Sequence, residues 1–206
     1  EMHEMGMEYL VFMSVANECK AYYPSKLMEW HYPQWRQSPV DAIMDAAAEH
    51  GMKVFMSTGW AVDQDDNLRD PKIKGRQIEM MTELAGLYGD HPAMYGWYLP
   101  VEDCFGPVLT DYAVEAVNAL TARAKELTPS ARTMISPYGI FNSDFDDPRY
   151  EQQISRLKID KPLRVKGESL IACLVMKMRS GRASCRTSKS NDLSRIYPIT
   201  YCNLSF

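Results

Sequence analysis

Glu102 is the residue whose surroundings most clearly suggest chemistry. It follows directly on an apolar run, residues 93–101, that has the length and composition of a buried strand. A carboxyl group held among aromatic neighbours of low dielectric has a raised pKa, and in that state it can protonate a glycosidic oxygen. The alternative is a surface glutamate that caps the next turn. Spacing alone does not separate these two interpretations.

Aromatic and polar side chains follow the other apolar runs of the chain in the same way. Aromatic rings can stack on the apolar faces of sugar rings, while amides and carboxylates form hydrogen bonds with sugar hydroxyls. This combination predicts a sugar site, with Glu102 as the candidate acid and with Asn17, Trp60, Asp103 and Tyr138 as candidate binding residues.

His31 lies between Trp30 and Tyr32 in the long segment after the first apolar run. It either touches the ligand or belongs to a packed cluster of loop aromatics that includes Trp35. Both interpretations stay open, and we include His31 among the candidate binding residues.

Four apolar runs recur at similar intervals, and their starts lie 44, 40 and 39 residues apart. Each run is nearly continuous in apolar residues, as in parallel strands that are covered on both faces. We predict four strands, at residues 9–14, 53–57, 93–98 and 132–136.

Amphipathic helices with capping residues separate these predicted strands. A small polar residue followed by proline or an acidic residue marks each helix start, and glycine or proline marks most of the ends. The starts are Ser38-Pro39, Asp70-Pro71, Thr110-Asp111 and Asp147-Pro148, and the ends are Gly51, Gly89 and Thr128-Pro129. Alternation of strand and helix predicts the α/β class with a parallel sheet.

A barrel fits this pattern better than an open doubly wound sheet. The sequence contains no Gly-rich phosphate-binding motif of the kind that opens many doubly wound sheets. The segments that follow the predicted strands are long and rich in Trp, Tyr, Asp and Pro, as on the catalytic face of a barrel. Because a complete (β/α)8 barrel needs about 250 residues, 206 residues predict a partial one.

The character of the sequence changes near residue 160. Residues 1–160 hold 14 basic and 25 acidic residues, a net charge of −11, whereas residues 161–206 hold nine basic and two acidic residues, a net charge of +7. No capped strand–helix unit follows residue 160. We therefore predict a barrel domain at 1–160 and an irregular basic tail at 161–206 that is disordered or non-native sequence. A tail that binds an acidic partner is the third interpretation.

Several functional classes are not expected. A net charge of −4 does not favour nucleic-acid binding. The sequence contains no run of 18 apolar residues, and so no membrane span is predicted. The N-terminus has no signal-peptide pattern. The five cysteines lack metal-ligand spacing, and the acidic run at 63–74 lacks the glycine and glutamate of a calcium loop. We therefore expect no metal and no cofactor.

Two resemblances refine this picture. Residues 96–102, Gly-Trp-Tyr-Leu-Pro-Val-Glu, resemble the fourth-strand segment Gly-Trp-x-x-x-Asn-Glu-Pro of clan A glycoside hydrolases, which carries the acid/base glutamate. This chain departs from that segment at Val101 and Asp103. Residues 5–160 more closely resemble the glycosidase-like barrel family catalogued as domain of unknown function 4434, which is common in gut Bacteroidetes. The segments that carry this resemblance are 5–11, 54–60, 96–102 and 135–139.

The second resemblance implies a TIM barrel, export to the periplasm or cell surface, and a carbohydrate ligand. In its register the chain spans about strands 2 to 5 of the barrel and lacks the seventh strand, which carries the nucleophile in clan A enzymes. We therefore expect a glycoside hydrolase fragment that is inactive at this length; the alternative is a non-catalytic glycan-binding module. We also expect no second carboxylate at the other strand ends, and open sheet edges that favour self-association.

Overall fold

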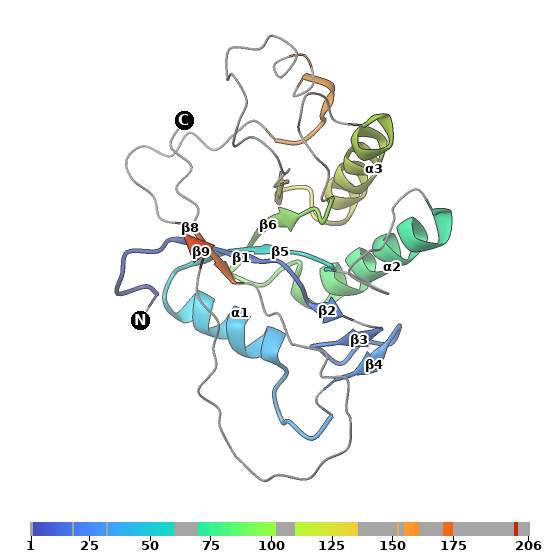
Figure 1. Cartoon of the computed structure of the whole chain (residues 1–206). Coiled ribbons are helices and arrows are strands. Elements are labelled where there is room, and N and C mark those ends of the chain that lie inside the picture. The colour runs from blue at the N-terminus through green and yellow to red at the C-terminus, as the bar shows by residue number, and fades with distance from the viewer. Residues whose placement is uncertain are drawn as a thin grey trace.

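The computed structural model describes residues 2–17, 19–31, 33–59, 70–101, 110–135, 152 and 155–160, and the backbone of residues 171–174 and 200–201. Its main sheet has six strands in the order β7-β6-β5-β1-β8-β9 (Figure 1). The four strands that the sequence predicted are all present and parallel to their neighbours. They are β1 at Tyr9–Phe12, β5 at Lys53–Met56, β6 at Met94–Tyr98 and β7 at Arg132–Met134.

Three helices connect these strands and begin where the capping residues predicted. They are α1 at Pro39–Glu49, α2 at Pro71–Tyr88 and α3 at Asp111–Leu127. Ser38 forms a capping box, in which its hydroxyl accepts the Asp41 amide at 3.0 Å and the Asp41 carboxylate accepts the Ser38 amide at 3.3 Å. The predicted start of a fourth helix at Asp147-Pro148 lies outside the described residues.

All three helices pack against the same face of the sheet. Buried residues of α1, α2 and α3 form one core cluster with the outward residues of the strands. The opposite face carries a second, smaller cluster of Tyr9, Val11, Phe55 and Tyr98. A doubly wound sheet would place helices on both faces, whereas helices on one face are the arrangement of a barrel wall.

A small second sheet lies in the segment between β1 and α1. It consists of β2 at Ala16–Asn17, β3 at Lys20–Ala21 and β4 at Glu29–Trp30, in that order. Strands of two residues leave no period in the sequence, so the sequence did not predict this sheet.

The structure also describes two short strands after residue 160. β8 at Ile171–Leu174 pairs in parallel with β1, and β9 at Thr200–Tyr201 pairs antiparallel with β8. The sequence after residue 160 has no capping pattern of a helix, and so the alternation that predicted the other strands gave no signal here. The backbone groups at the edge of a parallel strand can accept any extended segment, which accounts for pairing without a recognisable pattern.

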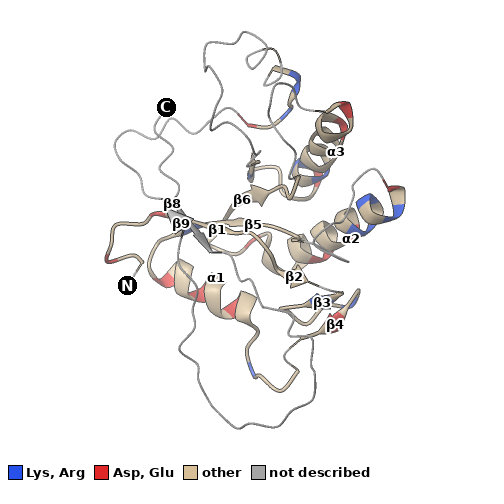
Figure 2. Ribbon diagram, viewed as in Figure 1, with Lys and Arg blue, Asp and Glu red and all other residues tan. Residues whose placement is uncertain are grey.

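Charged side chains are distributed unevenly over the described helices. Figure 2 shows acidic residues along α1, which has no Lys or Arg, and basic residues near the start of α2. Among the described residues, no helix has the length and apolar character that crossing a membrane would require.

Asp160 connects the segment 155–160 to α3 and β7 by hydrogen bonds. Its carboxylate accepts hydrogen bonds from Lys125 Nζ at 3.0 and 3.1 Å and from the Thr133 amide at 2.7 Å. Burial acts to raise the pKa of the Asp160 carboxyl, but the bonds from Lys125 and Thr133 outweigh it and hold the pKa below its ordinary value of 3.8. The ionised form of Asp160 therefore stabilises the folded chain.

We expect Asp160→Asn to destabilise the protein at neutral pH and to have little effect in acid. A carboxyl whose pKa is lower in the folded state stabilises the fold above about pH 4, and this contribution is lost as the pH falls further, through the folded pKa. Because the pair is partly exposed, the loss at pH 7 should be about 1 kcal/mol. Urea unfolding at pH 7 and pH 3 measures it.

Glu126→Gln is the control for this measurement, because Glu126 forms an exposed ion pair with Arg123 on the same helix. This control should change the free energy of unfolding by less than about 0.5 kcal/mol at both pH values. An equal effect of Asp160→Asn at pH 7 and pH 3 would contradict the assignment.

Candidate functional site

The four parallel strands end at one edge of the sheet, which we call the strand-end edge. Its described residues are 13–17, 57–59, 99–101 and 135. Polar groups gather in its first two segments, where Ser14, Ser57 and Thr58 are buried. In parallel barrels this edge holds the active site, because several strands deliver side chains to it together.

Gly59 brings the ends of β1 and β5 into direct contact. Its φ is +66°, a left-handed conformation that glycine adopts without strain. A Cβ atom at this position would overlap the Ser14 hydroxyl and lie 2.9 Å from the Ala16 carbonyl oxygen. The Ser14 hydroxyl in turn donates to the Ala16 carbonyl at 2.6 Å. The two strand ends therefore fit together only around a residue without a side chain.

Gln77 of α2 holds this junction from the helix side. Its Nε2 donates to the Gly59 carbonyl at 2.8 Å, and its Oε1 accepts a hydrogen bond from the Thr58 hydroxyl. Sequence reasoning missed Gln77. The available signal was a glutamine on the apolar stripe of α2, in line with Met80, Met81 and Leu84.

Asn17 and His31 are the two candidate binding residues that the structure describes. Asn17 lies in β2, in the segment that follows β1, and pairs with Lys20 of β3. His31 directly follows β4; its amide donates to the Ala21 carbonyl at 2.8 Å, and its ring packs edge-on against Tyr22 at 5.8 Å. The small sheet thus carries both residues.

Glu83 of α2 anchors the segment between β3 and β4. Its carboxylate accepts hydrogen bonds from the Tyr23 hydroxyl at 2.8 Å, the Ser25 hydroxyl at 2.6 Å and the Lys26 amide at 2.5 Å. Burial raises the pKa of the Tyr23 hydroxyl, and the bond to Glu83 raises it further. Tyr23 therefore remains a donor over the whole physiological pH range.

Residues 99–101 continue β6 to the strand-end edge. The Leu99 amide donates to the Met134 carbonyl at 2.8 Å, and Leu99 and Val101 are buried. Glu102, the predicted acid, is the next residue along the chain. Glu102 itself lies outside the described residues, as do the other three candidates, Trp60, Asp103 and Tyr138.

The second carboxylate is also not tested by the structure. Its candidates after the other strands, Asp63, Asp65 and Asp144, lie outside the described residues. The expected lack of a partner carboxylate therefore stays a prediction. Within the described part of the chain, His, Cys, Asp and Glu side chains form no group of three that could hold a metal ion.

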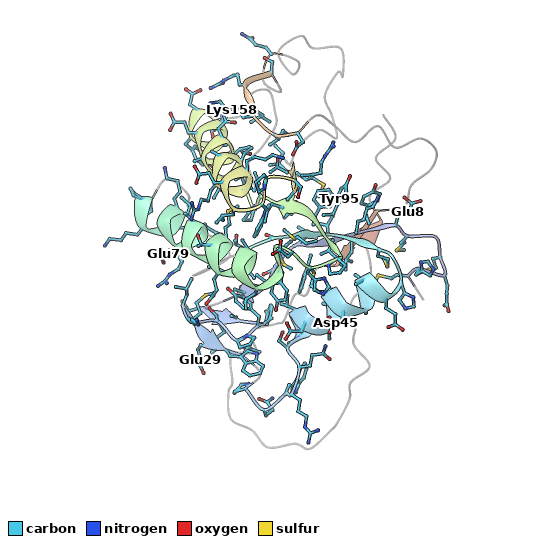
Figure 3. All side chains as sticks on the ribbon, turned by 180° about the vertical axis from the view of Figure 1, so that it is seen from behind. Glu8, Glu29, Asp45, Glu79, Tyr95 and Lys158 are labelled. Carbon is cyan, nitrogen blue, oxygen red and sulfur yellow. The ribbon has the colours of Figure 1, made fainter. Side chains whose placement is uncertain are left out.

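Aromatic side chains line the sheet face that the helices leave uncovered. Tyr95, labelled in Figure 3, packs edge-on against Phe55 at 5.3 Å and Tyr9 at 5.4 Å. Lys53 Nζ lies 5.2 Å from the ring centres of Tyr9 and Tyr95. Burial and the neighbouring Tyr9 raise the pKa of the Tyr95 hydroxyl. Tyr9 and Lys53 are the first residues of their strands, opposite the strand-end edge, where residues serve stability rather than catalysis.

The family is shown by a family model that matches most of the chain. Residues 1–166 match the model of Domain of unknown function (DUF4434). The chain belongs to this family. Among curated proteins, none matches the chain.

Solved structures of glycosidases share the fold of this DUF4434 chain. A candidate alpha-L-fucosidase from Bacteroides thetaiotaomicron VPI-5482 has a TM-score of 0.55 at 20% identity, covering 74% of this chain and 49% of its own. An endo-beta-1,4-mannanase from Thermotoga petrophila has a TM-score of 0.52 at 18% identity, covering 71% and 39%. A beta-galactosidase from the psychrophilic Marinomonas ef1 has a TM-score of 0.51 at 13% identity, covering 74% and 36%. The chain thus spans about half or less of these proteins.

Proposed function

We propose that the strand-end edge of this chain belongs to a carbohydrate site of a glycoside hydrolase-like barrel, with Glu102 as its general acid/base. The observation that carries the proposal is the course of β6. This strand runs parallel to β5 and β7, and buried Leu99 and Val101 follow it. Glu102 is the first carboxylate after a central barrel strand, and the neighbouring solved structures are named as glycosidases.

Aromatic and amide groups are the proposed binding partners of the sugar. Asn17 and His31 come from the small sheet beside the strand-end edge, while Trp60, Asp103 and Tyr138 follow β5, β6 and β7 in the sequence. A ring face for stacking and several hydrogen-bonding groups around one acid suit a pyranose ligand.

Hydrolysis requires a second carboxylate, at about 5–5.5 Å from the acid in retaining enzymes and about 6.5–9.5 Å in inverting ones. We propose that this chain has no such group and binds carbohydrate without cleaving it. A non-catalytic glycan-binding module is the alternative for the family as a whole. By family resemblance, we also propose that the parent protein acts in the periplasm or at the cell surface.

The test combines binding and turnover on the same variants. Oligosaccharide panels and aryl glycosides are offered to the full chain, to Trp60→Ala and to Glu102→Gln. We expect carbohydrate binding that Trp60→Ala weakens at least about tenfold, since a stacking ring contributes more than about 1.4 kcal/mol. We expect no hydrolysis by any of the three.

Glu79→Gln serves as the control, because Glu79 lies on α2 in an exposed pair with Arg76 (Figure 3). Turnover by the wild type that falls about 10²–10⁴-fold in Glu102→Gln alone would establish the acid and refute the inactive chain. Absence of carbohydrate binding across the panel would refute the proposed site.

A further inference from the structure

Gln77 is a buried polar side chain that the proposed chemistry does not use. It is 2% exposed and lies among Met80, Met81 and Leu84 on the face of α2 that packs against the sheet. Leucine or methionine would fill nearly the same volume there without needing hydrogen-bond partners. The amide is thus better explained by what it binds than by the packing of the core.

Both ends of the Gln77 amide bind consecutive residues at the end of β5. The Thr58 hydroxyl donates to Oε1, and Nε2 donates to the Gly59 carbonyl at 2.8 Å. The Ser57 hydroxyl accepts the Gly59 amide at 3.0 Å and closes the turn from the other side. Three consecutive residues are therefore held by a network that is buried throughout.

The position of Gly59 also affects the segment that follows β1. Gly59 lies against Ser14, which follows β1, and against Ala16, the first residue of β2, which directly precedes the candidate binding residue Asn17. Fixing Gly59 therefore also fixes the segment that leads from β1 to Asn17.

We propose that Gln77 is a positioning residue, which sets the conformation of the β1 and β5 ends and thereby aligns Asn17 for carbohydrate binding. The part of this inference that concerns carbohydrate binding rests on the proposed function. The alignment of the two strand ends by Gln77 does not depend on the proposed function. Gln77 is buried and is assigned no contact with the sugar.

The test replaces the amide by an apolar side chain of similar volume. Gln77→Leu removes both hydrogen bonds, and Gln77→Met is the second variant if the branched chain packs poorly. Thr128→Val is the matched control, because it removes a buried hydrogen-bond partner, that of Trp97 Nε1, at the C-terminal end of α3. Amide hydrogen exchange and carbohydrate affinity are measured well below the melting temperature of every variant.

We expect Gln77→Leu to raise exchange at least about tenfold in residues 14–17 and 57–59, with little change in β6 and β7. Carbohydrate affinity should fall about tenfold in this variant, whereas Thr128→Val should leave both quantities at these segments unchanged. Exchange that rises evenly over the chain, or affinity that matches the wild type despite local opening, would overturn the proposal. If the wild type binds no carbohydrate, the proposed function fails, and hydrogen exchange alone decides whether Gln77 aligns the strand ends.

Discussion

Replacing Gly59 with alanine should lower the free energy of unfolding by about 2–5 kcal/mol. Two costs add up. A side chain in the left-handed conformation costs about 1–2 kcal/mol, and overpacking a tight site costs about 1–3 kcal/mol. The new Cβ would overlap the Ser14 hydroxyl and lie 2.9 Å from both Ser14 Cα and the Ala16 carbonyl oxygen. Because two of these atoms belong to the backbone, a change of rotamer cannot relieve the clash.

Gly86→Ala is the matched control for Gly59→Ala. Gly86 lies inside α2, and no atom beyond its own stretch of helix lies within 4 Å of a Cβ built on it. Alanine there should stabilise the helix by roughly 0.5–1 kcal/mol. Thermal and urea unfolding of the two variants should therefore shift in opposite directions. Shifts of the same sign and size would show that the β1 and β5 ends do not meet at Gly59.

Removing the Trp97 side chain should have an effect of similar size. Trp97 lies in β6, is 1% exposed, and fills the core between the sheet and the helices. Its Nε1 donates to the Thr128 hydroxyl at 2.7 Å, and this hydroxyl donates to the Ala124 carbonyl at 3.0 Å. Trp97→Ala should therefore cost about 3–5 kcal/mol, measured by urea unfolding.

Two milder variants separate the packing of Trp97 from its hydrogen bond. Trp97→Phe keeps most of the buried apolar surface and leaves Thr128 bonded to Ala124, so its polar cost should be only about 1 kcal/mol. Thr128→Val leaves the indole N–H buried without an acceptor and should cost about 1–3 kcal/mol. If Trp97→Phe destabilised as much as Trp97→Ala, packing would not be the main contribution.

The elements that the sequence predicted are those with local signals. The Ser38-Pro39 pair placed the start of α1 at the correct residue, and the apolar runs located all four parallel strands. β1 is shorter than predicted, since the chain leaves the sheet after Phe12 and enters β2 at Ala16. Apolar composition does not record where a strand stops pairing.

Contacts between distant residues were beyond the reach of these signals. Glu83 binds Tyr23, 60 positions away, and Gln77 binds Gly59, 18 positions away. Neither pairing leaves a period or a motif, because each depends on how α2 packs on the finished sheet. The place of Glu102 after β6 followed from the apolar run before it, whereas its role as an acid came from resemblance to glycosidases.

The Glu83 contacts have a consequence for the thermodynamics of ligand binding. Ordering a flexible loop costs about 1–2 kcal/mol of backbone entropy per residue, and many binding proteins meet this cost only when the ligand arrives. Here the three hydrogen bonds to Tyr23, Ser25 and Lys26 order the segment before β4 during folding. A ligand that contacts His31 therefore meets a preorganised surface, and little of its binding enthalpy is offset by loss of loop entropy.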